Sequence, residues 1–146
     1  MSVTNSLRNA SFEEQSVWIQ LAGLAISFGG YLFVASRMLA SGVTMVQPFA
    51  AVWGVSVALL VVILVGGHVV AAVASRPDGG DERDRVIAWR AAARADWILG
   101  AGVIGGVGCM AVGVPNVWTA NLLLMSLYLA EMLGLALQAL DYRRGF

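Results

Sequence analysis

The chain has 146 residues, of which 59 % are apolar and only 12 % charged, and nine cationic and nine acidic side chains leave no net charge. Soluble domains carry about 25 % charged residues, so this composition is typical of a protein embedded in lipid. All nine cations are arginines, and a chain without lysine cannot form a Schiff base. Its single histidine, His68, and single cysteine, Cys109, exclude an internal disulfide, a Cys/His zinc cluster and a haem held by two histidines of one chain.

The first apolar run covers residues 17–38, after a polar segment of residues 1–15 that we expect to form an interfacial cap. About 20 apolar residues cross a hydrocarbon layer of about 30 Å, so this run predicts a membrane span. A secretory signal cleaved near Ala40 is the alternative interpretation. The run is long for a signal and its leader is not basic, which favours an uncleaved anchor.

The second apolar run covers residues 48–75 and is long enough to cross the bilayer with a tilt. Pro48 stands at its start, where the missing backbone N–H of proline does no harm to a helix. The Pro-Asp-Gly-Gly sequence at residues 77–80 then predicts the end of this helix.

Residues 76–95 form the one strongly charged segment and predict a water-facing connector between two apolar halves. We expect a helix N-cap at Asp81, because acidic residues precede the arginines in the order that suits the helix dipole. The stripe of Val86, Trp89, Ala93 and Trp97 predicts an amphipathic helix that leads into the third span. The segment is either a solvated helix end or a surface for a partner or lipid headgroups, and its main charged residues are Asp81, Glu82, Arg83, Asp84, Arg85 and Arg90.

The third and fourth apolar runs cover residues 96–113 and 117–140, and the third is rich in glycine. Because glycine weakens a helix, so many of them indicate close packing between helices. Small residues recur every four positions in two rows, which are Ala101, Gly105, Cys109 and Gly113, and Gly102 and Gly106. We interpret Cys109 as a small packing residue within the first row.

These elements predict an all-α membrane protein in which residues 1–146 form a single domain of four transmembrane helices, arranged as two hairpins in a bundle. An amino terminus in the cytoplasm leaves eight arginines inside and only Arg37 outside, as the positive-inside rule requires. Both termini and the connector are therefore expected in the cytoplasm.

Two similar sequences open the first and third spans, Trp18-Ile19-x-x-Ala22-Gly23 and Trp97-Ile98-x-x-Ala101-Gly102. If they stand at equivalent depths, the two hairpins are parallel repeats about an axis along the membrane normal. Chance similarity between apolar sequences is the alternative.

The connector carries the sequence Asp-Glu-Arg-Asp-x-x-Ile-x-x-Arg from Asp81 to Arg90, directly before a predicted span. In this it resembles a group of small four-span bacterial membrane proteins without an established activity. The resemblance implies a four-helix fold and a location in the bacterial inner membrane, and it implies no chemistry.

One acidic residue, Glu131, falls inside the fourth predicted span, ten residues before Asp141 and thus about 15 Å along the helix. A carboxylate at such a depth is costly unless it is paired or protonated. At 100° per residue, it shares one sector of the helix with four polar residues, which predicts a polar seam turned away from lipid: Asn121, Tyr128, Gln138 and Tyr142.

The single histidine, His68, lies about 12 Å along the second helix from Arg76, so it could meet Glu131 across the bundle. A buried His-Glu pair is a starting point for a proton relay, and Gln20 of the first helix could complete its polar surroundings. The alternatives are a protonated Glu131 bonded to a neighbouring helix and a neutral His68 bonded to a backbone carbonyl.

No catalytic constellation, phosphate-binding loop or set of metal ligands is evident, so we expect neither an enzyme nor a cofactor or metal site. Nucleic-acid binding is not expected, because the arginines are interleaved with acids. The leading interpretation is a membrane protein that acts by helix association, in a homo-oligomer or with a membrane-protein partner. The alternative is a small proton-coupled transporter or channel-like protein that uses Glu131 and His68.

Overall fold

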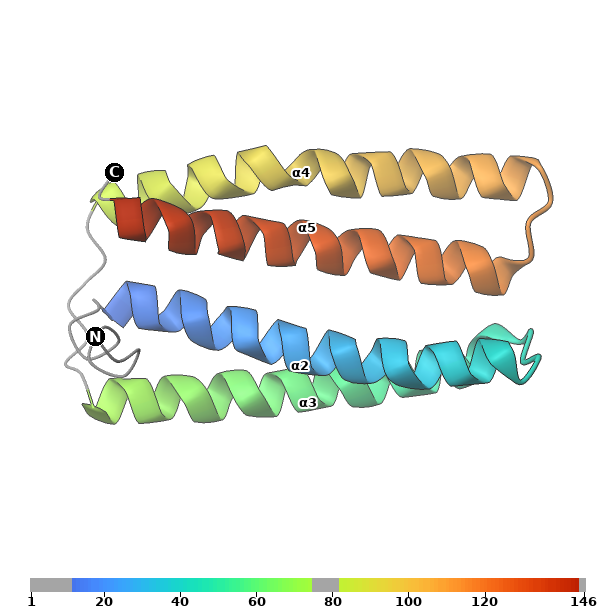
Figure 1. Ribbon diagram of the computed structural model, residues 1–146, viewed down its shortest axis with the longest axis horizontal. Helices are drawn as coiled ribbons and strands as arrows, with labels where there is room; N and C mark the ends of the chain where they lie inside the picture. Colours follow the sequence, from blue (N-terminus) through green and yellow to red (C-terminus); the bar gives the residue numbers. More distant parts are fainter. Residues whose placement is uncertain (1–11, 75–81, 145–146) are drawn as a thin grey trace.

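The computed structural model describes residues 12–74 and 82–144, and this part of the chain forms four long helices. They are α2 (Phe12–Ala40), α3 (Val46–Ala74), α4 (Glu82–Ala111) and α5 (Asn116–Arg144). All four lie along the long axis of the molecule, with α2 and α3 as one antiparallel hairpin and α4 and α5 as the other (Figure 1). The predicted all-helical architecture is confirmed.

Three of these helices are long and apolar enough to cross a membrane, over Glu13–Ala40, Val46–Val73 and Asn116–Arg144. The fourth, α4, does not reach this level because its first half carries the charges of the connector. Its apolar part, residues 97–111, is about 22 Å long at 1.5 Å per residue, against a hydrocarbon layer of about 30 Å. A third crossing by residues 96–113 therefore stays a prediction.

The helix boundaries differ from the predicted ones by a few residues at several ends, and two of the differences change the interpretation of a segment. The first helix begins at Phe12, within the segment expected to be an interfacial cap, and the connector from Glu82 onward is the first half of α4. This charged half continues in line with the apolar half and lies beside the last turns of α5 (Figure 1). The expected N-cap, Asp81, and the expected helix end at residues 77–80 lie outside the described residues.

Both hairpins turn through a glycine with positive φ, Gly42 at 80° and Gly113 at 76°. In each case the glycine N–H donates to the carbonyl three residues back, and the next N–H donates to the carbonyl five residues back. This is the Schellman arrangement, which ends a helix where only glycine adopts the left-handed conformation without strain.

These turns give the depth of the two similar sequences that open the first and third spans. The stretch of helix from Trp18 to the turn at Gly42 is longer than the stretch from Trp97 to the turn at Gly113. The difference is a little over two helical turns, or about 12 Å. The prediction that the two sequences occupy equivalent depths is wrong, so they do not support a repeat of the two hairpins.

The core joins α2, α3 and α5 from the middle of these helices toward the hairpin turns. Phe28 of α2 stacks on Tyr128 of α5, with ring centroids 4.5 Å apart, and Tyr31, Phe49 and Val117 are buried around them. The helix α4 packs mainly against α5. The outer faces of α3 and α4 are covered by exposed apolar side chains, as expected where lipid replaces water.

Candidate functional site

His68 lies between α2 and α3 in a chain of hydrogen bonds. Its Nδ1 is 2.7 Å from the Leu64 carbonyl oxygen and its Nε2 is 2.8 Å from the Ser16 hydroxyl, to which the Gln20 amide also donates at 3.0 Å. A neutral imidazole with its proton on Nδ1 is compatible with all three hydrogen bonds, because Nδ1 then donates to the Leu64 carbonyl and Ser16 donates to Nε2. The structure thus brings Gln20 and His68 together through Ser16 and occupies both ring nitrogens.

Asn121 and Tyr128 belong to the contact between α2 and α5. The Tyr31 hydroxyl donates to Oδ1 of Asn121 at 2.7 Å, and the Asn121 amide donates to the Val117 carbonyl at 2.7 Å. Tyr128 is buried against Phe28. Both residues therefore stabilise the joint between the two hairpins.

Glu131 does not face the interior with Tyr128. It is exposed, although it follows Tyr128 by only three residues, and it borders the surface between α4 and α5. The predicted polar seam therefore divides between two surfaces of α5. Since His68 is bonded within the α2–α3 pair and Glu131 borders α4, the structure does not pair these two residues.

Glu131 opens instead onto a shallow groove of about 140 Å³, here called the carboxylate groove. Asp96 of α4 and Gln138 of α5 line it together with Glu131, and neither carboxylate has a hydrogen bond or ion pair with any described residue. Between these polar groups lie mostly small and aliphatic side chains, Ala88, Ala92, Ala95, Leu99, Ala130, Gly134 and Leu135.

The register of α4 and α5 changes the depth expected for Glu131. A Cβ at Gly134 would lie 3.7 Å from the Ala95 Cβ, and Gly102 faces Ser126, so Glu131 is level with the residues just after Asp96. This is where the charged half of α4 ends. If Ala111 marks one edge of a hydrocarbon layer of about 30 Å, both carboxylates lie about 8 Å inside the other edge.

Sequence reasoning treated Asp96 only as the start of a span and missed its place beside Glu131. The signal that could have placed Asp96 beside Glu131 is the number of residues between each of them and the hairpin turn. In two antiparallel helices joined by a short turn, residues at equal distances from the turn lie side by side. Asp96 precedes Gly113 by nearly the same length of chain as that by which Glu131 follows it. In both cases the length is about 26 Å of helix.

The two small-residue rows have different roles. Gly102 and Gly106 are buried in the contact with α5, where a Cβ at Gly102 would come within 2.1 Å of the Ser126 side chain. In the other row, Ala101 is exposed, Gly105 and Cys109 are half-buried, and Gly113 forms the turn. The Gly102 row is therefore used within the chain and is not free for another molecule.

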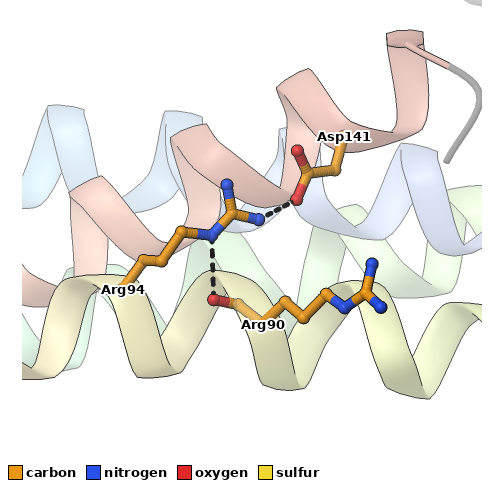
Figure 2. A network of polar contacts seen from close by, with 3 residues as sticks. All are labelled: Arg90, Arg94 and Asp141. Carbon is orange, nitrogen blue, oxygen red and sulfur yellow. Dashed lines mark hydrogen bonds and ion pairs between the residues drawn. The ribbon is translucent and has the colours of Figure 1, made fainter.

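The described residues of the predicted connector lie on the first half of α4. Arg94 is bonded to Asp141 near the end of α5, and its Nε donates to the Arg90 carbonyl at 3.1 Å (Figure 2). Sequence analysis did not predict this ion pair across the hairpin. It holds the charged half of α4 against α5, so Glu82, Arg83, Asp84, Arg85 and Arg90 are carried on a helix of defined position.

We expect His68 and Glu131 to be energetically independent. His68→Ala removes two hydrogen bonds and should lower the free energy of unfolding by about 1–2 kcal/mol, whereas Glu131→Gln should change it by less than about 0.5 kcal/mol. The effects should add within about 0.5 kcal/mol in the double variant. Denaturant titration in detergent micelles measures all three values.

The matched control pairs His68→Ala with Ser16→Ala, which removes the other end of the same hydrogen bond. These two changes should be clearly non-additive, because either one alone breaks the bond. A coupling above about 1 kcal/mol between His68 and Glu131 would contradict the separation of the two residues.

In residues 12–74 and 82–144, no group of three His, Cys, Asp or Glu side chains is arranged to hold a metal ion. Comparison with known protein families, curated proteins and solved structures finds no match for this chain. Any function must therefore be argued from the geometry of the chain itself.

Proposed function

We propose that this chain is a four-span protein of the bacterial inner membrane that binds a transmembrane helix of a partner protein in the carboxylate groove. The observation that carries the proposal is the position of Asp96 and Glu131, which open onto one groove of small side chains without any partner among the described residues.

Three apolar helices and the exposed apolar faces of α3 and α4 support insertion into a membrane. The antiparallel partner of α4 is one of these three helices, so insertion of α5 carries the apolar half of α4 with it. With four crossings, the end of the bundle that carries Arg94, Arg143 and Arg144 lies on one side of the membrane. The excess of arginine at this end supports a cytoplasmic location for it.

The composition of the carboxylate groove suits a helix. Small residues let two helices approach closely, and polar side chains across the contact add about 0.6–2 kcal/mol in membranes. Ala88, Ala92 and Ala95 of α4 supply such a surface beside Gly134 of α5. A docked helix would cover both carboxylates.

The negative charge of the carboxylate groove favours a partner helix that carries a cation. Two uncompensated carboxylates about 8 Å inside the hydrocarbon edge are stabilised by a nearby cation. Transmembrane helices carry arginine or lysine at their cytoplasmic ends, and long cationic side chains reach this level by extending along the helix. The proposed partner therefore bears an arginine or lysine within the last turns of its span on the cytoplasmic side.

The transporter alternative has weaker support. Its relay requires His68 to meet Glu131, and both nitrogens of His68 are used by Ser16 and the Leu64 carbonyl. Proton flux into vesicles that is lost in Glu131→Gln would favour transport over helix docking.

The direct test uses a single-span leucine-alanine peptide with one arginine near its cytoplasmic end, and the same peptide with leucine at that position. We expect the arginine peptide to bind about tenfold more tightly to the full chain in phosphatidylcholine vesicles, a difference of about 1.4 kcal/mol. Energy transfer between dyes on the two molecules measures binding. The double variant Asp96→Asn/Glu131→Gln should abolish the preference.

A steric variant gives an independent control. Ala92→Leu fills the carboxylate groove and should weaken both peptides, whereas the same change at the exposed Ala58 of α3 should weaken neither. Equal binding of the arginine and leucine peptides, or binding unaffected by Ala92→Leu, would overturn the proposal. Self-association of the chain that excludes the peptides would do the same.

A further inference from the structure

A second and larger groove lies between α4 and α5 near their charged ends, and it shares no lining residue with the carboxylate groove. Its volume is about 700 Å³, within the range of ligand-binding pockets. Four arginines line it against two acids: Arg83, Arg90, Arg94 and Arg144 against Glu82 and Asp141. We call it the cationic groove.

The arginines of the cationic groove are not all consumed by the protein. Asp141 is buried and engages Arg94, which fixes one guanidinium at the edge of the groove. Arg90 extends along α4 away from Arg94, and its guanidinium makes no contact with the other residues drawn in Figure 2. No described residue forms an ion pair or hydrogen bond with the guanidinium of Arg90 or Arg144.

The position of the cationic groove matches the headgroup layer. On α4 it begins at Glu82 and ends at Arg94, two residues before Asp96 of the carboxylate groove, so it lies on the water-facing side of the carboxylates. The exposed indole of Trp89 lies at this level on α4 and that of Trp97 follows just after Arg94, and exposed aromatic side chains are typical of membrane interfaces. Val86 and Ile87 add an apolar lining to the cationic groove.

We infer that the cationic groove binds the phosphodiester headgroup of an anionic phospholipid. Guanidinium groups bind phosphate oxygens through paired N–H donors, and basic pockets between membrane helices on the cytoplasmic side suit such headgroups. The phosphate would lie between Arg90 and Arg144, with Arg94 held in place by Asp141 and the lipid chains directed along α4 toward its apolar half. The inference depends on insertion in a membrane and is independent of helix docking in the carboxylate groove.

The test compares binding of phosphatidylglycerol and phosphatidylcholine to the detergent-solubilised full chain by native mass spectrometry. The wild-type chain should prefer phosphatidylglycerol by at least about tenfold. The variant Arg90→Gln/Arg144→Gln should lose about 25-fold in affinity for that lipid, at roughly fivefold per arginine. Arg37→Gln is the matched control because it removes one arginine at the opposite end of α2, and it should leave the preference unchanged.

A free phosphate is distinguished by competition, since it would use the same donors. Millimolar inorganic phosphate should not displace phosphatidylglycerol, and displacement would overturn assignment to a lipid. Loss of the preference in Arg37→Gln, or its survival in the double arginine variant, would overturn the site itself. Salt provides a check without mutation, because about 0.5 M NaCl should reduce the lipid preference of the wild-type chain.

Discussion

Replacing Gly102 with alanine should lower the free energy of unfolding by at least about 2 kcal/mol. The added Cβ would come within 2.1 Å of both Cβ and Oγ of Ser126, and 3.6 Å from its Cα, so α4 and α5 must move apart to admit it. Overpacking a close contact costs about 1–3 kcal/mol, and here it strains the main contact of α4. Denaturant titration in detergent micelles measures the loss.

Three neighbouring glycines provide graded controls on the same helix. A Cβ at Gly106 would lie 2.9 Å from the end of the Leu123 side chain, which can shift, and a Cβ at Gly105 would lie 3.6 Å from Leu122. A Cβ at Gly100 would meet nothing within 4 Å. We therefore expect the loss on substitution by alanine to decrease in the order 102, 106, 105, 100.

The combined variant Gly102→Ala/Ser126→Gly decides the cause. If Ser126 is the obstacle, removing its side chain should restore most of the lost stability. If Gly102→Ala lowers the free energy of unfolding as little as Gly100→Ala does, α4 and α5 do not approach each other closely at Gly102.

Breaking the ion pair between Arg94 and Asp141 should destabilise the protein more when Arg94 is replaced than when Asp141 is replaced. Arg94→Met leaves a buried carboxylate without its cation, and we expect a loss of about 2–3 kcal/mol. Asp141→Leu leaves Arg94, whose side chain is 48 % exposed and can turn toward water, so a loss of about 1 kcal/mol is expected. Unfolding titrations of the two single variants measure the asymmetry.

The double variant Arg94→Met/Asp141→Leu completes this cycle. It should be more stable than Arg94→Met alone, because no unpaired carboxylate remains buried. Equal losses from both single variants, or a double variant that is the least stable of the three, would contradict the argument that burial of Asp141 sets the cost.

The helical content could be predicted well because the length and apolarity of a span are local properties. Residues 17–38, 48–75 and 117–140 all lie within observed helices, apart from residue 75, which is outside the described part of the chain. The third span was predicted to end at Gly113, which is the glycine of the second hairpin turn. The start of the first helix was placed too late, at residue 17 instead of Phe12, because a polar amino-terminal turn gives no hydropathy signal.

The candidate polar site was harder to predict because it depends on which faces meet. A helical wheel put Tyr128 and Glu131 in one sector, but the contact with α2 buries the first and leaves the second exposed. His68 was considered with a distant acid, although its partner Ser16 stands on the adjacent helix of the same hairpin. The alternative of a bond from His68 to a backbone carbonyl is confirmed.

The sequence by itself determined that the chain is helical and that it contains long apolar segments; it predicted four spans, and three of the described helices are apolar enough to cross a membrane. These properties follow from the residues of each segment, without reference to any other segment. Only the tertiary structure decided which glycines pack internally, which acid Arg94 engages, and that Asp96 and Glu131 border one groove. The physical reason is register: a small rotation or axial shift between two helices changes every lateral contact while leaving the hydropathy of each helix unchanged.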